Sequence, residues 1–94
     1  MDNKGLDIKL RVDRCHFAYV NKELLLKAMR SRGNVININT YIRDIVYNNY
    51  KIKLETKKDI ELLKEHITKD YYGDIREFLQ EKMREDIRNN KGEE

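Results

Sequence analysis

The stretch of sequence that decides the fold is Val20–Val46, VNKELLLKAMRSRGNVININTYIRDIV. Its apolar residues recur at helical spacing on both sides of Gly33, which predicts two short amphipathic helices joined by a turn. Asn21 precedes the first helix and can cap it, because an asparagine side chain accepts hydrogen bonds from first-turn amides. Arg30 and Arg32 followed by Gly33 are typical of a helix end, where cations oppose the helix dipole and glycine tolerates positive φ.

The second helix of this stretch begins after an asparagine and ends near Tyr50. Either Asn37 or Asn39 can serve as its cap. Its expected buried face comprises Tyr41, Ile42, Ile45 and Val46. Among the other tyrosines, Tyr19 and Tyr47 fit the strand and helix patterns best as core residues, so we expect no base stacking from them.

The chain before this stretch, Leu6–Val20, has the pattern of β structure. Apolar and charged residues alternate from Leu6 to Val12, and a second alternation from Cys15 to Tyr19 has its apolar set on odd positions. The phase therefore changes at Asp13-Arg14. Either one strand is interrupted there or a tight hairpin joins two strands. We favour the interrupted strand, because the favoured two-residue hairpin turns need positive φ, which Asn or Gly supplies.

Two further helices are expected after residue 52. Thr56 and Asp59 form a capping box, and Asp74 repeats the device before a fourth helix. That last helix carries an apolar seam of Ile75, Phe78, Leu79, Met83 and Ile87. The seam favours packing against the third helix or a symmetry mate, with docking of a partner protein as the alternative. We divide the chain into residues 1–51 and residues 52–94, of which the second part is a helical C-terminal arm.

Composition limits the classes of protein to which the chain can belong. Of 94 residues, 39% are hydrophobic and 39% charged, which indicates a highly solvated chain that gains stability from oligomerisation. The single cysteine, Cys15, excludes an intrachain disulfide and fits a reducing compartment. There is no apolar run of membrane-spanning length, and the N-terminal MDNKGLD lacks a signal-peptide core, so we expect a cytoplasmic protein.

Catalytic and metal-binding patterns are missing from the sequence. The two histidines and the one cysteine lack the spacing of metal ligands, and the sequence contains no phosphate-binding or dinucleotide-binding glycine loop. The sequence therefore predicts neither an enzyme nor a metal or cofactor site. The charge is uneven: residues 1–51 hold ten Lys/Arg against five Asp/Glu, and residues 52–94 hold ten against twelve. A basic first half is a weak indication of a polyanionic partner.

Four features follow one another over about residues 14–50: the strand region, the Asn-Lys-Glu-Leu helix, the Arg-Gly turn and the Asn-Ile-Asn-Thr-Tyr-Ile-Arg-Asp-Ile-Val helix. Together they resemble the ribbon-helix-helix family. The Tyr-Ile-Arg-Asp element is similar to the MobC-like mobilisation-protein branch of that family. The resemblance implies a mainly α fold with a short β element, in which a dimer carries a C-terminal helical extension. It makes residues 1–51 a ribbon-helix-helix-like DNA-binding domain. It implies sequence-specific binding to double-stranded DNA, at a plasmid transfer origin or partition site or as an autoregulatory repressor.

In that family the strands of two subunits form a ribbon that enters the major groove, which is wide enough for it and exposes a distinct pattern for each base pair. The resemblance therefore implies base contacts from the outward strand residues, with Arg14 as the best candidate for a guanine contact. Amides at the start of the second helix could hold a backbone phosphate. The candidate DNA-binding residues are Lys9, Arg11, Arg14, His16, Asn37, Asn39 and Thr40. Further partners would be a second copy of the chain, as dimer or tetramer, and a relaxase bound to the C-terminal helices.

Two other hypotheses remain open. A winged helix-turn-helix protein would use the β segment as a hairpin wing, with a turn at Asp13-Arg14, and the helix after Asn37 to read DNA. It predicts a monomeric fold. A protein-interaction module would bind no nucleic acid and would use the C-terminal seam for its partner.

Overall fold

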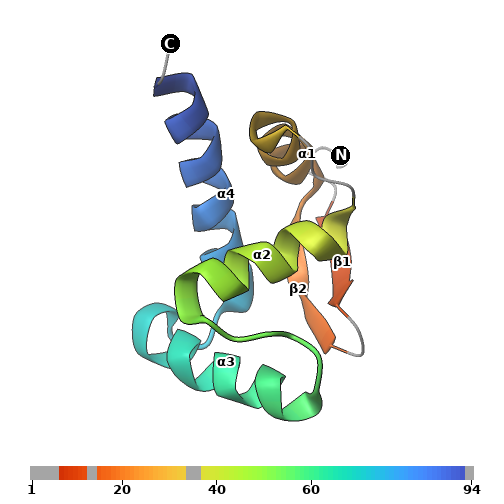
Figure 1. Cartoon of the computed structure of the whole chain (residues 1–94), viewed down its shortest axis with the longest axis vertical. Coiled ribbons are helices and arrows are strands. Elements are labelled where there is room, and N and C mark those ends of the chain that lie inside the picture. Colours follow the sequence, from red (N-terminus) through yellow and green to blue (C-terminus); the bar gives the residue numbers. More distant parts are fainter. Residues whose placement is uncertain (1–6, 13–14, 34–36, 93–94) are drawn as a thin grey trace.

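The computed structural model describes residues 7–12, 15–33 and 37–92, and the side chains of residues 19–33 and 37–90. Two strands are followed by four helices (Figure 1). Their bounds are β1 Asp7–Val12, β2 Cys15–Asn21, α1 Lys22–Arg32, α2 Ile38–Tyr50, α3 Lys57–Tyr71 and α4 Ile75–Gly92. The described part of the chain is thus mainly helical with a short β element, as predicted.

The β segment is a hairpin. β1 and β2 pair antiparallel, with Val12 opposite Cys15, so the favoured interpretation of one interrupted strand is wrong. Pairing within the chain satisfies the backbone of both strands along one edge, and this outweighs the poor turn preference of Asp-Arg. The two residues of that connection, 13 and 14, lie outside the described residues.

The hairpin contains a change of register between Lys9 and Arg11. Lys9 lies opposite Tyr19 and Arg11 opposite His16, so two residues of β2 face one residue of β1, as in a β-bulge. A bulge reverses the alternation beyond it. Tyr19 is accordingly 48% exposed and Val20 is fully buried, so the prediction that Tyr19 packs in the core is wrong.

Side-chain caps start the helices where the sequence indicates. Asn21 Oδ1 accepts from the Leu24 amide at 2.9 Å, and Asn37, rather than Asn39, caps α2 by accepting from the Thr40 amide at 2.8 Å. The predicted capping box of Thr56 and Asp59 is present. Asp74 Oδ1 accepts from the Glu77 amide at 3.1 Å and starts α4. Gly33, with φ of 86°, ends α1.

The apolar seam of α4 is buried within the chain. Phe78, Leu79 and Met83 are fully buried and Ile75 nearly so. α4 lies chiefly against α1 and β2 and less against α3, so intramolecular packing is confirmed but its main partner is not the predicted one. Residues of both predicted segments, 1–51 and 52–94, contribute to one continuous core. The C-terminal helices therefore pack on the first half of the chain, and Ile87 is the one seam residue among those described that stays partly exposed.

A polar contact ties three helices together at the far end of α4. Asp86 accepts a hydrogen bond from the Tyr41 hydroxyl and pairs with Arg32 at 3.3 Å. Burial, followed by the bond to Asp86, raises the pKa of Tyr41. Tyr41 is 1% exposed, which confirms its predicted place in the core, whereas Tyr47 is 43% exposed and its predicted burial is wrong. None of the described helices has both the length and the apolar character needed to cross a membrane.

Candidate nucleic-acid interface

The hairpin has an inner and an outer face, which the described side chains at its end identify. Val20 is buried, and the position opposite it, Ile8, shares that inner face. Tyr19 is half exposed, so its partner position Lys9 lies on the outer face. Arg11, two residues along β1 from Lys9, falls on the same face.

The outer face thus brings together three of the predicted DNA-contacting positions. His16 lies directly opposite Arg11, so the positions of Lys9, Arg11 and His16 follow one another along this face. Arg14, the fourth candidate in the strand region, lies outside the described residues. The alternation of β1 was sufficient to place Lys9 and Arg11. The sequence did not predict which residues of β2 lie opposite Lys9 and Arg11, because this depends on the register of the hairpin.

The N-terminus of α2 lies along one side of the hairpin. α2 contacts β1, and its first half crosses the hairpin in Figure 1. Asn37, Asn39 and Thr40 are all exposed there. The first turn of α2 contains no acidic residue, whereas those of α1, α3 and α4 contain Glu23, Asp59 and Glu77. The positive end of the α2 dipole is therefore not balanced by a carboxylate of its own first turn.

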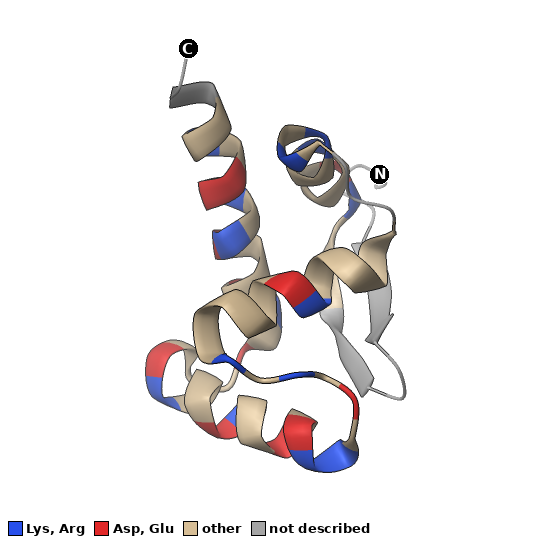
Figure 2. Cartoon of the chain, viewed as in Figure 1, with Lys and Arg blue, Asp and Glu red and all other residues tan. Residues whose placement is uncertain are grey.

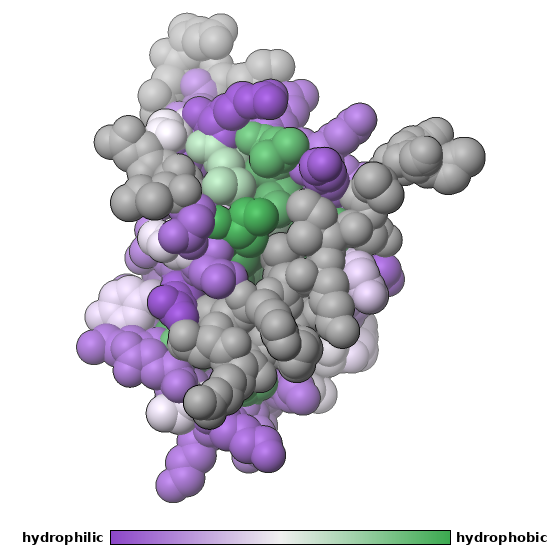
Figure 3. All heavy atoms as spheres, turned by 90° about the vertical axis from the view of Figure 1, so that its right-hand side faces the viewer, coloured by the Kyte–Doolittle hydropathy of each residue, from purple (hydrophilic) through white to green (hydrophobic). Residues whose placement is uncertain are grey.

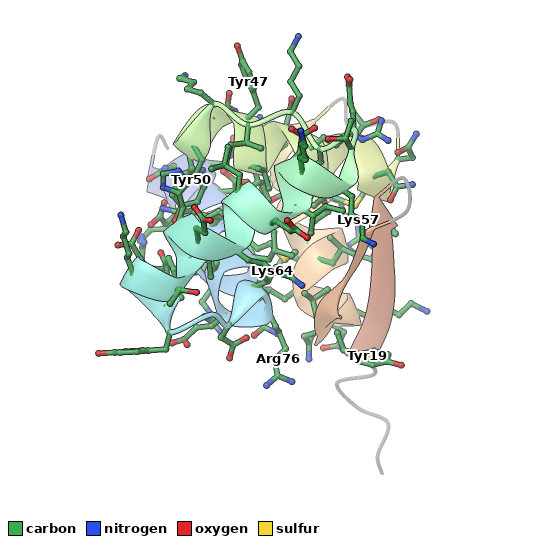
Figure 4. All side chains as sticks on the ribbon, turned by 90° about the horizontal axis from the view of Figure 1, so that it is seen from below. Tyr19, Tyr47, Tyr50, Lys57, Lys64 and Arg76 are labelled. Carbon is green, nitrogen blue, oxygen red and sulfur yellow. The ribbon has the colours of Figure 1, made fainter. Side chains whose placement is uncertain are left out.

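The other side of the hairpin is bordered by α4. An open groove of about 480 Å³ lies between the end of β2 and the first half of α4, lined by Asn21, Asp74, Arg76, Glu77, Gln80 and Arg84. Tyr19 and Arg76 point to the same side of the molecule in Figure 4. Sequence reasoning missed these arginines, although the spacing of Arg76, Gln80 and Arg84 already placed them on one helical face.

A second hollow lies on the opposite side, where Tyr47 points in Figure 4. It has a volume of about 210 Å³ and is lined by Arg43, Asp44, Tyr47, Lys53, Leu54 and Glu55. The Lys51 ammonium lies 5.4 Å from the centre of the Tyr47 ring, within cation–π range. Charges of both signs alternate around this hollow, so its lining does not select an anionic ligand.

An aromatic cluster joins α2, α3 and α4. The Tyr50 ring stacks on His66 at 5.2 Å and meets Phe78 at 5.4 Å, and Tyr71 meets Phe78 edge-on at 5.5 Å. Burial, then the hydrogen bond to Asp70, raises the pKa of Tyr50 to about 12. The pKa of Tyr71 is also raised, chiefly by burial. These shifts stabilise protonated phenols, so the cluster is a structural contact between helices.

The exposed charges of the second half are mixed in sign. Figure 2 shows acidic and basic residues interspersed along α3 and α4. Across the part of the chain that the structure describes, no group of three or more His, Cys, Asp or Glu side chains could hold a metal ion. Comparison with family models, with curated proteins and with solved structures finds no match to this chain.

Proposed function

We propose that the chain binds double-stranded DNA and that its hairpin enters the major groove. The observation that carries this proposal is the backbone register of the hairpin, which brings the positions of Lys9, Arg11 and His16 together on the face away from the core. A two-stranded ribbon fits the major groove, where arginine and lysine make the commonest specific contacts, to guanine. Arg14, in the connection between the strands, is the fourth base-contacting residue of the proposal.

In this proposal, one chain supplies both strands of the ribbon. The resemblance to ribbon-helix-helix proteins implies one strand from each of two subunits, but here β2 pairs with β1 of its own chain. A single chain could therefore present a ribbon to one groove. Several expectations stay predictions: dimerisation, tetramers, a relaxase partner, and a role at a transfer origin, partition site or promoter.

The start of α2 supports the hairpin by holding a phosphate. Asn37 uses its side chain to cap the helix, which leaves amides of the first turn directed outward, and Asn39 and Thr40 are exposed beside them. Such helix ends bind phosphate oxygens through their N–H groups and the positive end of the dipole. A phosphate contact of this kind fixes the orientation of the protein but does not read sequence.

The decisive experiment measures binding of the full chain to double-stranded DNA from its own genetic neighbourhood over a series of salt concentrations. We expect affinity to fall steeply with salt, and one site to bind more tightly than random DNA. Arg11→Gln and Arg14→Gln should each cost about 1–3 kcal/mol of binding at that site. Lys69→Gln, an exposed change of equal charge on α3, is the matched control. Absence of any binding at low salt contradicts the proposal.

A winged helix-turn-helix arrangement is a second candidate, because that hypothesis required a hairpin turning at residues 13 and 14 within one chain. In that arrangement α2 reads the bases, with Asn39 and Thr40 at its exposed start. The two candidates separate in a specificity assay. If α2 reads bases, Asn39→Ala and Thr40→Ala change the preferred sequence and Arg14→Gln weakens all sequences alike. If the hairpin reads bases, the opposite result is expected.

The protein-interaction hypothesis loses the surface on which it depended. The α4 seam is covered by α1 and β2, and the large apolar side chains that remain exposed are spread over several elements: Tyr19, Leu26, Tyr47, Leu62 and Tyr72. On the face shown in Figure 3, the described apolar groups gather mainly in one area, with hydrophilic groups next to it. These features do not favour docking of a partner protein on the α4 seam.

A further inference from the structure

Two arginines line the groove beside β2. Arg76 and Arg84 are both exposed and are separated by two helical turns on one face of α4, about 12 Å at the rise of an α-helix. Within the described residues, Arg76 forms no ion pair, and Arg84 contacts the neutral amide of Gln80 at 3.5 Å. Both guanidinium groups are thus available to an anionic ligand.

The acidic residues of the groove have a structural task. Asp74 caps α4 by accepting from the Glu77 amide, and Glu77 lies in the first turn, where a carboxylate opposes the helix dipole. With two carboxylates and two guanidinium groups, the groove as a whole has no net charge. The lining as a whole therefore does not select a small anion, whereas the two exposed guanidinium groups can each contact a separate group of an extended anionic ligand.

The position of Arg76 and Arg84 relative to the hairpin indicates what kind of anionic ligand they could bind. α4 contacts β2, whereas α2 contacts β1. In Figure 4, Arg76 of α4 points to the same side of the molecule as Tyr19, and Tyr47 of α2 points to the opposite side. A ribbon in a DNA groove has one phosphate backbone on each side of it. We propose that Arg76 and Arg84 bind phosphates of the backbone on the β2 side, opposite the phosphate held by α2; this rests on the proposed function. A span of about 12 Å covers between three and four nucleotides of one strand, at 3.4 Å along the axis for each.

The experiment compares the double variant Arg76→Gln/Arg84→Gln with Lys64→Gln/Lys69→Gln, which removes the same charge from exposed positions of α3. The slope of log K against log salt concentration falls by about 0.9 for each phosphate that the protein no longer neutralises. We expect the α4 variant to reduce the slope by about 2 and to weaken specific and random DNA equally. The α3 variant should keep the wild-type slope. Arg76→Lys/Arg84→Lys should also keep it, because it retains both charges, and circular dichroism checks that every variant is folded.

The possible results separate the two proposals. If Arg11→Gln weakens binding while the α4 variant behaves like the α3 control, the phosphate contacts are wrong and the proposed function stands. If the α4 variant changes the preferred sequence, Arg76 and Arg84 contact bases, and the inference is again wrong. If the wild-type chain binds no double-stranded DNA, the proposed function is wrong and the inference falls with it.

Discussion

The four helices and the hairpin use their residues for different purposes. Among the described side chains, the buried ones lie mostly in the helices and in the loops between them, and each helix is started by a side-chain cap. Among the described side chains, the hairpin adds Val20 to the core. Its outer face instead holds the positions of Lys9, Arg11 and His16. We therefore expect substitutions in the described helical core to change stability and substitutions on the outer face of the hairpin to change the proposed recognition.

The largest expected effect is in the helical part. Phe78 is fully buried and meets the rings of Tyr50 and Tyr71, so Phe78→Ala removes packing against α2 and α3 at once. We expect a decrease of about 3–5 kcal/mol in the free energy of unfolding, measured by urea denaturation. Because small domains are stable by about 5–15 kcal/mol, the variant loses a large share of its stability, and it should lose DNA binding at a lower urea concentration than wild type.

The control for Phe78→Ala is Tyr72→Ala, which removes a ring that is 94% exposed. We expect this variant to stay within about 0.5 kcal/mol of wild type, as is usual for surface changes. Equal decreases in the two variants would mean that the aromatic cluster does not hold the helices together.

The difference between the helices and the hairpin also explains which features could be predicted from the sequence. Helix starts are local: Asn21, Asn37 and Thr56 each precede a helical apolar pattern, and the bonds that they make span three residues. The apolar stripes also predicted Tyr41 and the α4 seam as core.

The long-range features could not be predicted in this way. The packing of α4 on α1 joins segments about fifty residues apart, and no local pattern encodes it. The hairpin register depends on a bulge, which reversed the side to which Tyr19 points. The same limit applies to the candidate site. The alternation of β1 predicted outward positions for Lys9 and Arg11, but Arg76 and Arg84 became candidates only when α4 was placed beside β2.

An intermediate effect is expected from the Tyr50 hydroxyl, which donates to Asp70 at 3.2 Å. Tyr50→Phe keeps the ring contacts and should cost at most about 1.5 kcal/mol at pH 8. The ordinary pKa of 10.0 is raised to about 12 in the folded chain, so the folded state holds this proton more tightly than the unfolded state. The contribution is therefore complete below pH 10 and is lost as the pH rises through about 12.

The measurement for Tyr50→Phe is the difference in urea midpoint from wild type at pH 8 and again at pH 11. Tyr41 and Tyr71 are present in both proteins, so their titration largely cancels in the difference. We expect the difference to shrink at the higher pH, while DNA affinity at pH 8 stays unchanged because Tyr50 lies away from the hairpin. A difference of the same size at both pH values would contradict the role assigned to the hydroxyl.

The smallest expected effect on stability is also the sharpest test of whether stability and the proposed DNA recognition can be separated. One substitution should change the two in opposite directions. Asn39 is exposed in the first turn of α2, which has no acidic residue. Asn39→Asp should raise the free energy of unfolding by about 0.3–1 kcal/mol at low ionic strength, since a carboxylate there opposes the helix dipole. The same carboxylate should repel a DNA phosphate and weaken binding severalfold.

Asn48→Asp is the matched control for Asn39→Asp: it makes the same chemical change at an exposed position near the other end of α2. There a carboxylate meets the negative end of the dipole, so stability should fall slightly and DNA affinity should keep nearly its wild-type value. If both variants weaken DNA binding equally, the loss reflects net charge alone. The phosphate contact at the start of α2 would then be wrong, although the hairpin could still read the groove.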